Sequence, residues 1–181
     1  QRGSYRLTVG DVSMMLQLEM ADRWEKEGAD PVLITAQNLN GSDVKAEGSY
    51  IIYKVEEHDS VGRPVAKGSF TTGEQAALKQ KLAALKSGKY RVKLSSEDDR
   101  GNPVEAEKDL ILYSFTDKRP PVKTNDWFVI RSNTFSPGKP AEVLLGTTDR
   151  VHVLYELWKE KQLLERRWLT MEKENRRFLF P

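Results

Sequence analysis

Residues 88–94 have the sequence Gly88-Lys89-Tyr90-Arg91-Val92-Lys93-Leu94, in which apolar and basic side chains alternate. This alternation places Tyr90, Val92 and Leu94 on one face of a β-strand and the basic side chains on the other. Residues 97–103 form a turn rich in Asp, Gly and Asn, and residues 104–115 supply the return strand. The region predicts an antiparallel hairpin with one face on a core and the other in water.

Five further segments on the N-terminal side have the composition of strands. They are residues 5–9, 14–20, 31–36, 48–55 and 65–70. Residues 48–55 are the most β-like of these segments, and Ile51, Tyr53 and Val55 would share a face of that strand. Residues 38–41, with the sequence Asn-Leu-Asn-Gly, predict a turn because Asn and Gly tolerate positive φ. Residues 58–64 are expected to be a polar loop.

One short helix interrupts this pattern. Residues 74–86 are rich in Ala, Leu, Lys and Gln, which favour helix. Leu78, Leu82 and Leu85 recur at helical spacing. Gly88 can end the helix in a left-handed conformation.

A pair of prolines divides the chain. Pro120 and Pro121 cannot continue a central strand. We therefore expect a first domain at residues 1–117, a linker at residues 118–126 and a second domain at residues 127–181. The second domain has about 55 residues, which is short for an independent sandwich, so we expect it to be incomplete.

The ends of the chain suggest a fragment of a longer protein. Residues 3–9 match residues 88–94 in Gly, Tyr and Arg and in the alternation. Residues 1–10 are therefore expected to be the last strand of a preceding module. The chain begins at Gln1 and ends on an apolar stretch without a polar tail.

Residues 151–171 allow two interpretations. Periodicity alone favours a helix, because five apolar residues fall on a near-heptad stripe. They are Leu154, Leu157, Leu164, Trp168 and Met171. The alternative is a hairpin with its turn near residues 159–162, a stretch that lacks Gly and Asn and is a poor turn by sequence.

The composition restricts the possible functions. Of the 181 residues 31% are charged and 38% hydrophobic, and 29 basic residues nearly balance 27 acidic ones. Such a mixed surface gives no strong field for nucleic acid or an anionic membrane. No apolar run approaches the roughly 20 residues of a membrane helix. The absence of cysteine excludes disulfides, a thiol nucleophile and a Cys-based zinc site.

The two histidines are weak candidates for chemistry. His58 lies in the stretch Glu56-Glu57-His58-Asp59, which could ligate a cation, although a solvated charged turn is commoner for such a sequence. His152 lies between two valines and is typical of a strand. Residues 97–99 with Asn102 offer oxygen ligands for calcium but lack EF-hand spacing, so a hairpin turn is preferred.

Other motifs of chemistry are missing from the sequence. There is no glycine-rich phosphate cradle and no Gly-x-Ser-x-Gly elbow. A basic aromatic patch could form from Arg166, Arg167, Arg176, Arg177, Trp168 and Phe178. A solvated basic strand edge is the commoner cause of such a pattern. We therefore expect no catalytic, cofactor-binding or metal-binding residues.

Three stretches together resemble the alpha-2-macroglobulin family, particularly its bacterial members. Residues 85–92 and 99–104 are similar to the Gly-x-Tyr strand and Asp-x-Gly-Asn turn that end a macroglobulin-like module. Residues 32–41 and 50–55 are similar to the early strands of such a module. Residues 135–145 resemble the Pro-Gly opening of the next module and are the most specific of the three.

The resemblance implies a fold. In the family, the Pro-Gly opening is followed by a valine–leucine strand, a hairpin and a tryptophan-bearing strand, and residues 153–156 and 167–169 fit that order. A hairpin is therefore implied at residues 151–171, against the periodicity. The implied class is mostly β, with tandem antiparallel β-sandwich domains of the macroglobulin-like (fibronectin- or immunoglobulin-like) type and at most one short helix.

The resemblance also implies a function. The chain would be a non-enzymatic pair of scaffold modules from a large protease trap, an endopeptidase inhibitor of the periplasm or cell surface in the bacterial envelope. Its partners would be target proteases, engaged through the full-length protein, and neighbouring domains of the same chain. No cofactor is implied, and neither nucleic acid nor a membrane span is expected for this chain.

Many family members carry a thioester formed within a Cys-Gly-Glu-Gln motif. This chain has Thr72-Gly73-Glu74-Gln75, in which Thr72 stands where the cysteine must be. A hydroxyl cannot form that thioester, so we interpret the match as chance.

The alternative function is a surface adhesion or carbohydrate-binding β-sandwich, because such modules share these strand lengths and turns. They usually present a row of exposed aromatic residues, whereas the four tryptophans here are dispersed in sequence. They are Trp24, Trp127, Trp158 and Trp168.

Overall fold

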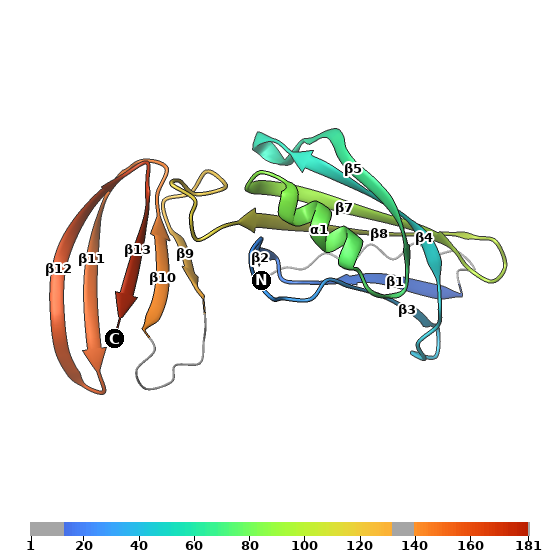
Figure 1. Ribbon diagram of the computed structural model, residues 1–181, viewed down its shortest axis with the longest axis horizontal. Coiled ribbons are helices and arrows are strands. Elements are labelled where there is room, and N and C mark those ends of the chain that lie inside the picture. Colours follow the sequence, from blue (N-terminus) through green and yellow to red (C-terminus); the bar gives the residue numbers. More distant parts are fainter. Residues whose placement is uncertain (1–12, 132–139, 181) are drawn as a thin grey trace. The chain divides into compact units, whose positions relative to one another are not determined.

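The computed structural model describes residues 13–131 and 140–180. The chain divides into two compact units, Gln1–Leu112 and Tyr113–Pro181. Both are built from antiparallel strands, as the sequence predicted, and the described residues contain one short α-helix (Figure 1). The predicted strand at residues 5–9, and residues 135–139 of the Pro-Gly opening, lie outside the described residues.

The first unit is a β-sandwich. One sheet has the strand order β1-β3-β6, and the other has the order β2-β8-β7-β4-β5. The strands are β1 (Met14–Glu19), β2 (Arg23–Glu25), β3 (Leu33–Asn38), β4 (Glu47–Val55), β5 (Val61–Thr71), β6 (Gly73–Glu74), β7 (Gly88–Glu97) and β8 (Pro103–Tyr113). Their inward side chains form one core, in which Leu16 and Ile34 from the first sheet lie with Ile52, Val92 and other residues of the second.

The hairpin predicted for residues 88–115 is formed. β7 pairs with β8 along its whole length, and Tyr90, Val92 and Leu94 are buried. Helix α1 (Ala76–Ala84) adds Leu78 and Leu82 to the same core. The helix ends before Gly88, because Leu85 already has an extended conformation and Gly88 is the first residue of β7.

Strand β4 departs from the expected alternation. Tyr50 and Ile52 are buried, whereas Ile51 and Tyr53 are half-buried. The register between β4 and β5 shifts after Ile52 and again before Val55. Val55 is buried, so the prediction that it shares a face with Ile51 and Tyr53 was wrong: a bulge of this kind changes which way the following side chains point.

Strand β5 is longer than expected. The predicted loop at residues 58–64 is shorter in the structure, with a 3-10 turn at Glu57–Asp59 and β5 beginning at Val61. Pro64 lies inside the strand, which it can do because β5 is at the edge of its sheet. The turn at residues 38–41 is formed as predicted, with Gly41 at a φ of 77°.

The second unit has a three-stranded sheet and a hairpin. The sheet has the order β13-β10-β9, from β9 (Trp127–Ile130), β10 (Ala141–Gly146) and β13 (Asn175–Phe180). The hairpin consists of β11 (Arg150–Lys159) and β12 (Gln162–Glu172). The buried apolar residues of the second unit, among those that the structure describes, include Tyr113, Phe115, Trp127, Val129, Leu144 and Met171.

The hairpin decides between the two interpretations of residues 151–171. Arg150 pairs with Glu172 and Lys159 with Gln162, so the turn lies at Glu160 and Lys161. The structure therefore has the hairpin implied by the family resemblance, and the helix favoured by periodicity is absent.

Part of the predicted linker is bonded to the second unit. The backbone N–H of Asn175 donates to the carbonyl of Lys118 at 2.8 Å, and its side-chain Nδ2 donates to the carbonyl of Asp117 at 3.0 Å. Thr124 and Thr148 also exchange hydrogen bonds. The sequence-based limits of the two domains stay a prediction.

Candidate functional surfaces

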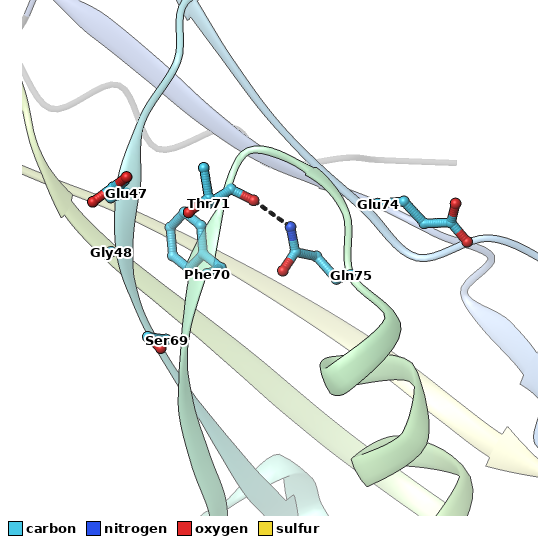
Figure 2. Close-up of a pocket in the computed structure, with 7 residues that line it drawn as sticks. All are labelled: Glu47, Gly48, Ser69, Phe70, Thr71, Glu74 and Gln75. Carbon is cyan, nitrogen blue, oxygen red and sulfur yellow. Dashed lines mark hydrogen bonds between the residues drawn. The ribbon is translucent and has the colours of Figure 1, made fainter.

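A shallow hollow lies between β4, β5 and the start of α1. Its volume is about 440 Å³, and Figure 2 shows the residues that line it. They are Glu47, Gly48, Ser69, Phe70, Thr71, Glu74 and Gln75. These seven include two carboxylates and two hydroxyls but neither an imidazole nor an amine. The hollow therefore offers neither an imidazole nor an amine as a partner for its hydroxyls, and its only candidate bases are the carboxylates of Glu47 and Glu74.

The thioester-like residues have structural roles at this hollow. The side-chain Nε2 of Gln75 donates a hydrogen bond to the carbonyl of Thr71 (Figure 2). It donates a second hydrogen bond to the carbonyl of Gly73. The hydroxyl of Thr72 accepts a hydrogen bond from the backbone N–H of Ala46. The Gln75 carboxamide thus holds the turn that leads into α1, which agrees with the interpretation of the sequence match as chance.

The two histidines are both exposed. His58 lies in the 3-10 turn with a φ of 63°, and the neighbouring Asp59 pairs with Lys89 at 2.7 Å. His152 lies on β11, where its Nδ1 is 3.2 Å from the hydroxyl of Thr170. Among the described residues, no three His, Asp or Glu side chains gather closely enough to hold a metal ion.

The acidic turn at residues 97–103 is a hydrogen-bonded clamp. The carboxylate of Asp98 accepts hydrogen bonds from the backbone N–H and hydroxyl of Ser13, from the backbone N–H of Arg100 and from both nitrogens of Asn102. These donors, with the Ser13 N–H contributing most, hold the pKa of Asp98 well below its ordinary value. Asp98 therefore joins the start of β1 to the β7–β8 turn.

The clamp predicts a loss of stability in acid. Because the folded-state pKa of Asp98 is lowered, its contribution to stability is present above the ordinary carboxyl pKa and is lost as the pH falls toward the folded value. We expect the thermal midpoint of the first unit to fall between about pH 5 and pH 2, and to fall less steeply in Asp98→Ala. Thermal unfolding followed by circular dichroism at each pH measures this. Glu27→Gln, an exposed change elsewhere in the unit, should keep the wild-type slope; equal slopes for Asp98→Ala and wild type would contradict the clamp.

The outward side of β7 and β8 is a ladder of ion pairs. Arg91 forms a bidentate pair with Asp109 at 2.6 and 3.0 Å, and Lys93 pairs with Glu105 at 2.7 Å. The hydrogen bond that Arg91 donates to the carboxylate of Asp109 raises the pKa of Arg91. Because these charges neutralise one another across the strands, this face is a solvated sheet surface and not a charged binding site.

The six residues that could have formed a basic aromatic patch do not form a single surface. Arg167 lies over the Tyr155 ring at 5.0 Å, and Phe178 stacks on the same ring from β13. Arg176 pairs with Glu174, and Arg177 pairs with Glu142. Only Arg166 and Trp168 belong to the opposite side of the hairpin, described next.

One side of the β11–β12 hairpin exposes large apolar side chains. Leu154 is 44% exposed and lies directly opposite Trp168, which is 69% exposed. Glu156 lies opposite Arg166, and their side chains pair at 2.7 Å. Trp158, 51% exposed, donates its indole N–H to Glu156. We call these five residues the outer face of the hairpin.

Sequence reasoning missed the outer face. The four tryptophans were described as dispersed, and along the chain they are. The hairpin nevertheless brings Trp158 and Trp168 to the same side of one two-stranded sheet, while Trp24 and Trp127 are buried. The signal that could have found it is the period of two in Leu154, Glu156 and Trp158, once residues 151–171 are assigned to strands.

Comparisons with known proteins find a likeness in structure but none in sequence. No family model matches the chain, and no curated protein matches it in sequence. Among solved structures it is similar to the native conformation of alpha-2-macroglobulin from E. coli, with 11% identity and a TM-score of 0.37. The match covers 93% of this chain and 14% of that protein. Among the described residues, no helix is long and apolar enough to span a membrane.

Proposed function

We propose that this chain is a pair of non-catalytic scaffold modules from a larger macroglobulin-like protein, a broad trap for endopeptidases outside the cytoplasm. The modules correspond to residues 1–117 and 127–181, joined by residues 118–126. Their work is mechanical: stiff sandwiches position a cleavable segment of the larger protein and move when that segment is cut. The partners are the target proteases and the neighbouring domains of the same chain.

The observation that carries the proposal is the hairpin of β11 and β12. The family resemblance implied it at residues 151–171, where the apolar periodicity favoured a helix. The structure has the hairpin, with its turn between Lys159 and Gln162 as expected. The hairpin supports the family resemblance because the apolar spacing of residues 151–171, taken alone, favoured a helix.

The use of polar groups agrees with a scaffold. Gln75, Asp98 and Arg91 make hydrogen bonds that join strands and turns. The described residues bring neither histidine together with acids in a group that could bind a metal. The hydrogen bonds of Gln75, Asp98 and Arg91 stabilise the sheets and their turns, which is the role that a scaffold requires.

The trap can be tested on the complete protein that carries these modules. A caged endopeptidase should keep its activity on a small chromogenic peptide and lose most of its activity on a large protein substrate. We expect at least a tenfold difference between the two activities after the trap and the protease are mixed in equal amounts. Small-angle scattering should show a compaction on cleavage.

Two results would contradict the trap. Equal activity on both substrates, or an unchanged scattering profile after complete cleavage, would exclude caging. The isolated 181-residue chain is the matched control, because it should inhibit neither activity.

A further inference from the structure

The outer face of the hairpin is unusual because the opposite side of the same strands also carries apolar residues. Met171 on that other side is buried, and Val151, Val153 and Leu169 are half-buried. An antiparallel hairpin with a single covered side normally has polar residues on its free side. Exposed aromatic residues gathered on one side of a sheet are typical of an interaction surface.

The residues of the outer face are arranged in three levels along the hairpin. At the first level, Leu154 on β11 lies opposite Trp168 on β12. At the second level, Glu156 on β11 lies opposite Arg166 on β12. At the third level, Trp158 lies opposite Leu163 of β12, which is half-buried and precedes the bulge residue Leu164. Each level thus combines a large with a smaller apolar residue, or an acid with a base.

We infer that the outer face binds the same face of a second copy of this chain. Consider a two-fold axis that is parallel to the strands, lies in front of the outer face and passes midway between β11 and β12. Rotation about this axis brings β11 of one copy over β12 of the other at the same level. Leu154 then meets the second copy's Trp168, and Glu156 meets its Arg166. Every level is matched with its complement in size or charge, as a two-fold interface requires.

The charges favour this occupant over a charged partner. Glu156 and Arg166 neutralise one another, so the outer face has no net charge to attract an acidic or a basic surface. In the dimer each of these groups gains a second partner of opposite sign. The indole of Trp158 is already held by Glu156 at 3.0 Å, so little rotamer entropy is lost when it is covered.

The size of the face sets the strength of the dimer. Strands of ten residues extend about 33 Å, and the two strands lie about 5 Å apart. Such a narrow surface is smaller than a standard stable interface of about 800 Å² per partner. The association is therefore weak and reversible: we expect a dimer at a chain concentration of about 100 µM and a monomer at about 1 µM.

The test measures the mass of the 181-residue chain across this concentration range by sedimentation equilibrium. Glu156→Arg gives an outer face with two positive charges, and Arg166→Glu gives one with two negative charges. Each variant alone should stay monomeric at 100 µM, because like charges meet at the second level. An equimolar mixture of the two should form a heterodimer at least as tight as the wild-type dimer. The mixture also shows that the single variants are folded.

Controls separate this surface from general stickiness. Lys45→Glu and Leu39→Ser change an exposed charge and an exposed leucine of the first unit and should leave the dimer unchanged. Trp168→Thr, which keeps a strand-forming residue, should weaken the dimer by at least tenfold.

Three outcomes would overturn the inference: a wild-type chain that stays monomeric at 100 µM, a mixture that stays monomeric, or a dimer that survives Trp168→Thr. Quenching of tryptophan fluorescence by a neutral β-linked oligosaccharide, with the mass remaining that of a monomer, would assign the outer face to carbohydrate binding instead.

Discussion

Replacing Gly48 by alanine is expected to destabilise the first unit by about 3 kcal/mol, close to the upper end of the effects of overpacking. An added Cβ would lie 2.3 Å from the backbone carbonyl oxygen of Ser95 and 2.7 Å from Cζ of Phe70. The Ser95 oxygen belongs to β7, which is paired with β4, so it cannot move without separating the strands. Phe70 is buried and cannot turn outward without opening the hollow beside Gln75.

Thermal unfolding of the first unit measures this effect. A loss of about 3 kcal/mol should lower the midpoint by about 15 °C for a unit of this size. Ser49→Ala is the matched control, because Ser49 is the next residue of β4 and is exposed. It should change the midpoint by no more than about 2 °C. A similar, small shift for both variants would mean that β4 and β7 are not as close as the structure places them.

Replacing Trp127 by alanine is expected to cost the second unit about 4 kcal/mol, the usual range for a buried tryptophan. Trp127 is almost completely buried, and its ring lies edge-on to Tyr113 with centroids 5.6 Å apart. It belongs to the short strand β9, which among the described strands pairs only with β10. The cavity left behind cannot be closed by other described aromatic residues without disturbing this sheet.

This change also tests the division into two domains. Trp127→Ala should lower an unfolding transition that belongs to the second unit and leave the transition of the first unit unchanged, as seen by calorimetry. Phe128→Ala is the control, because Phe128 is the next residue of β9 and is half exposed. It should cost less than about 1 kcal/mol. A single transition lowered equally in both halves would show that the chain unfolds as one domain.

The strands with regular alternation could be predicted from the sequence. Residues 88–94 gave β7 and its buried side chains, because the side chains of a strand alternate and only one side of this hairpin faces the core. Leu78 and Leu82 likewise predicted the buried side of α1. In these elements the local pattern and the tertiary packing favour the same structure.

The failures arise where the backbone leaves its regular path. The bulge in β4 placed Val55 on the buried side. None of the residue types in residues 48–55 indicates a bulge. The stripe from Leu154 to Met171 has helical spacing by coincidence: in the hairpin, Leu154 and Trp168 are on the outer face and Met171 is on the other. The turn was hard to predict because Glu160, a non-glycine residue, has a φ of 54° there.

The candidate surface depends on pairing between strands, which a single sequence does not contain. Trp158 and Trp168 meet on one side only because Leu154 pairs with Trp168 and Lys159 with Gln162. A slip by one residue would have moved one tryptophan to the other side. The absence of a catalytic or metal site stays a prediction.

The hydrogen bonds made by Asn175 affect how the second unit folds during synthesis on the ribosome. Asn175 begins β13, the last strand, and it holds the carbonyls of Asp117 and Lys118, more than fifty residues earlier. β13 also completes the pairing of β10. The second unit therefore cannot close until β13 has left the exit tunnel, whereas the β11–β12 hairpin, with its short-range contacts, can form beforehand. During that interval the hairpin of the nascent chain would expose Trp158 and Trp168 before the sheet of β9, β10 and β13 is complete. A chaperone that covers exposed apolar side chains would act at this stage.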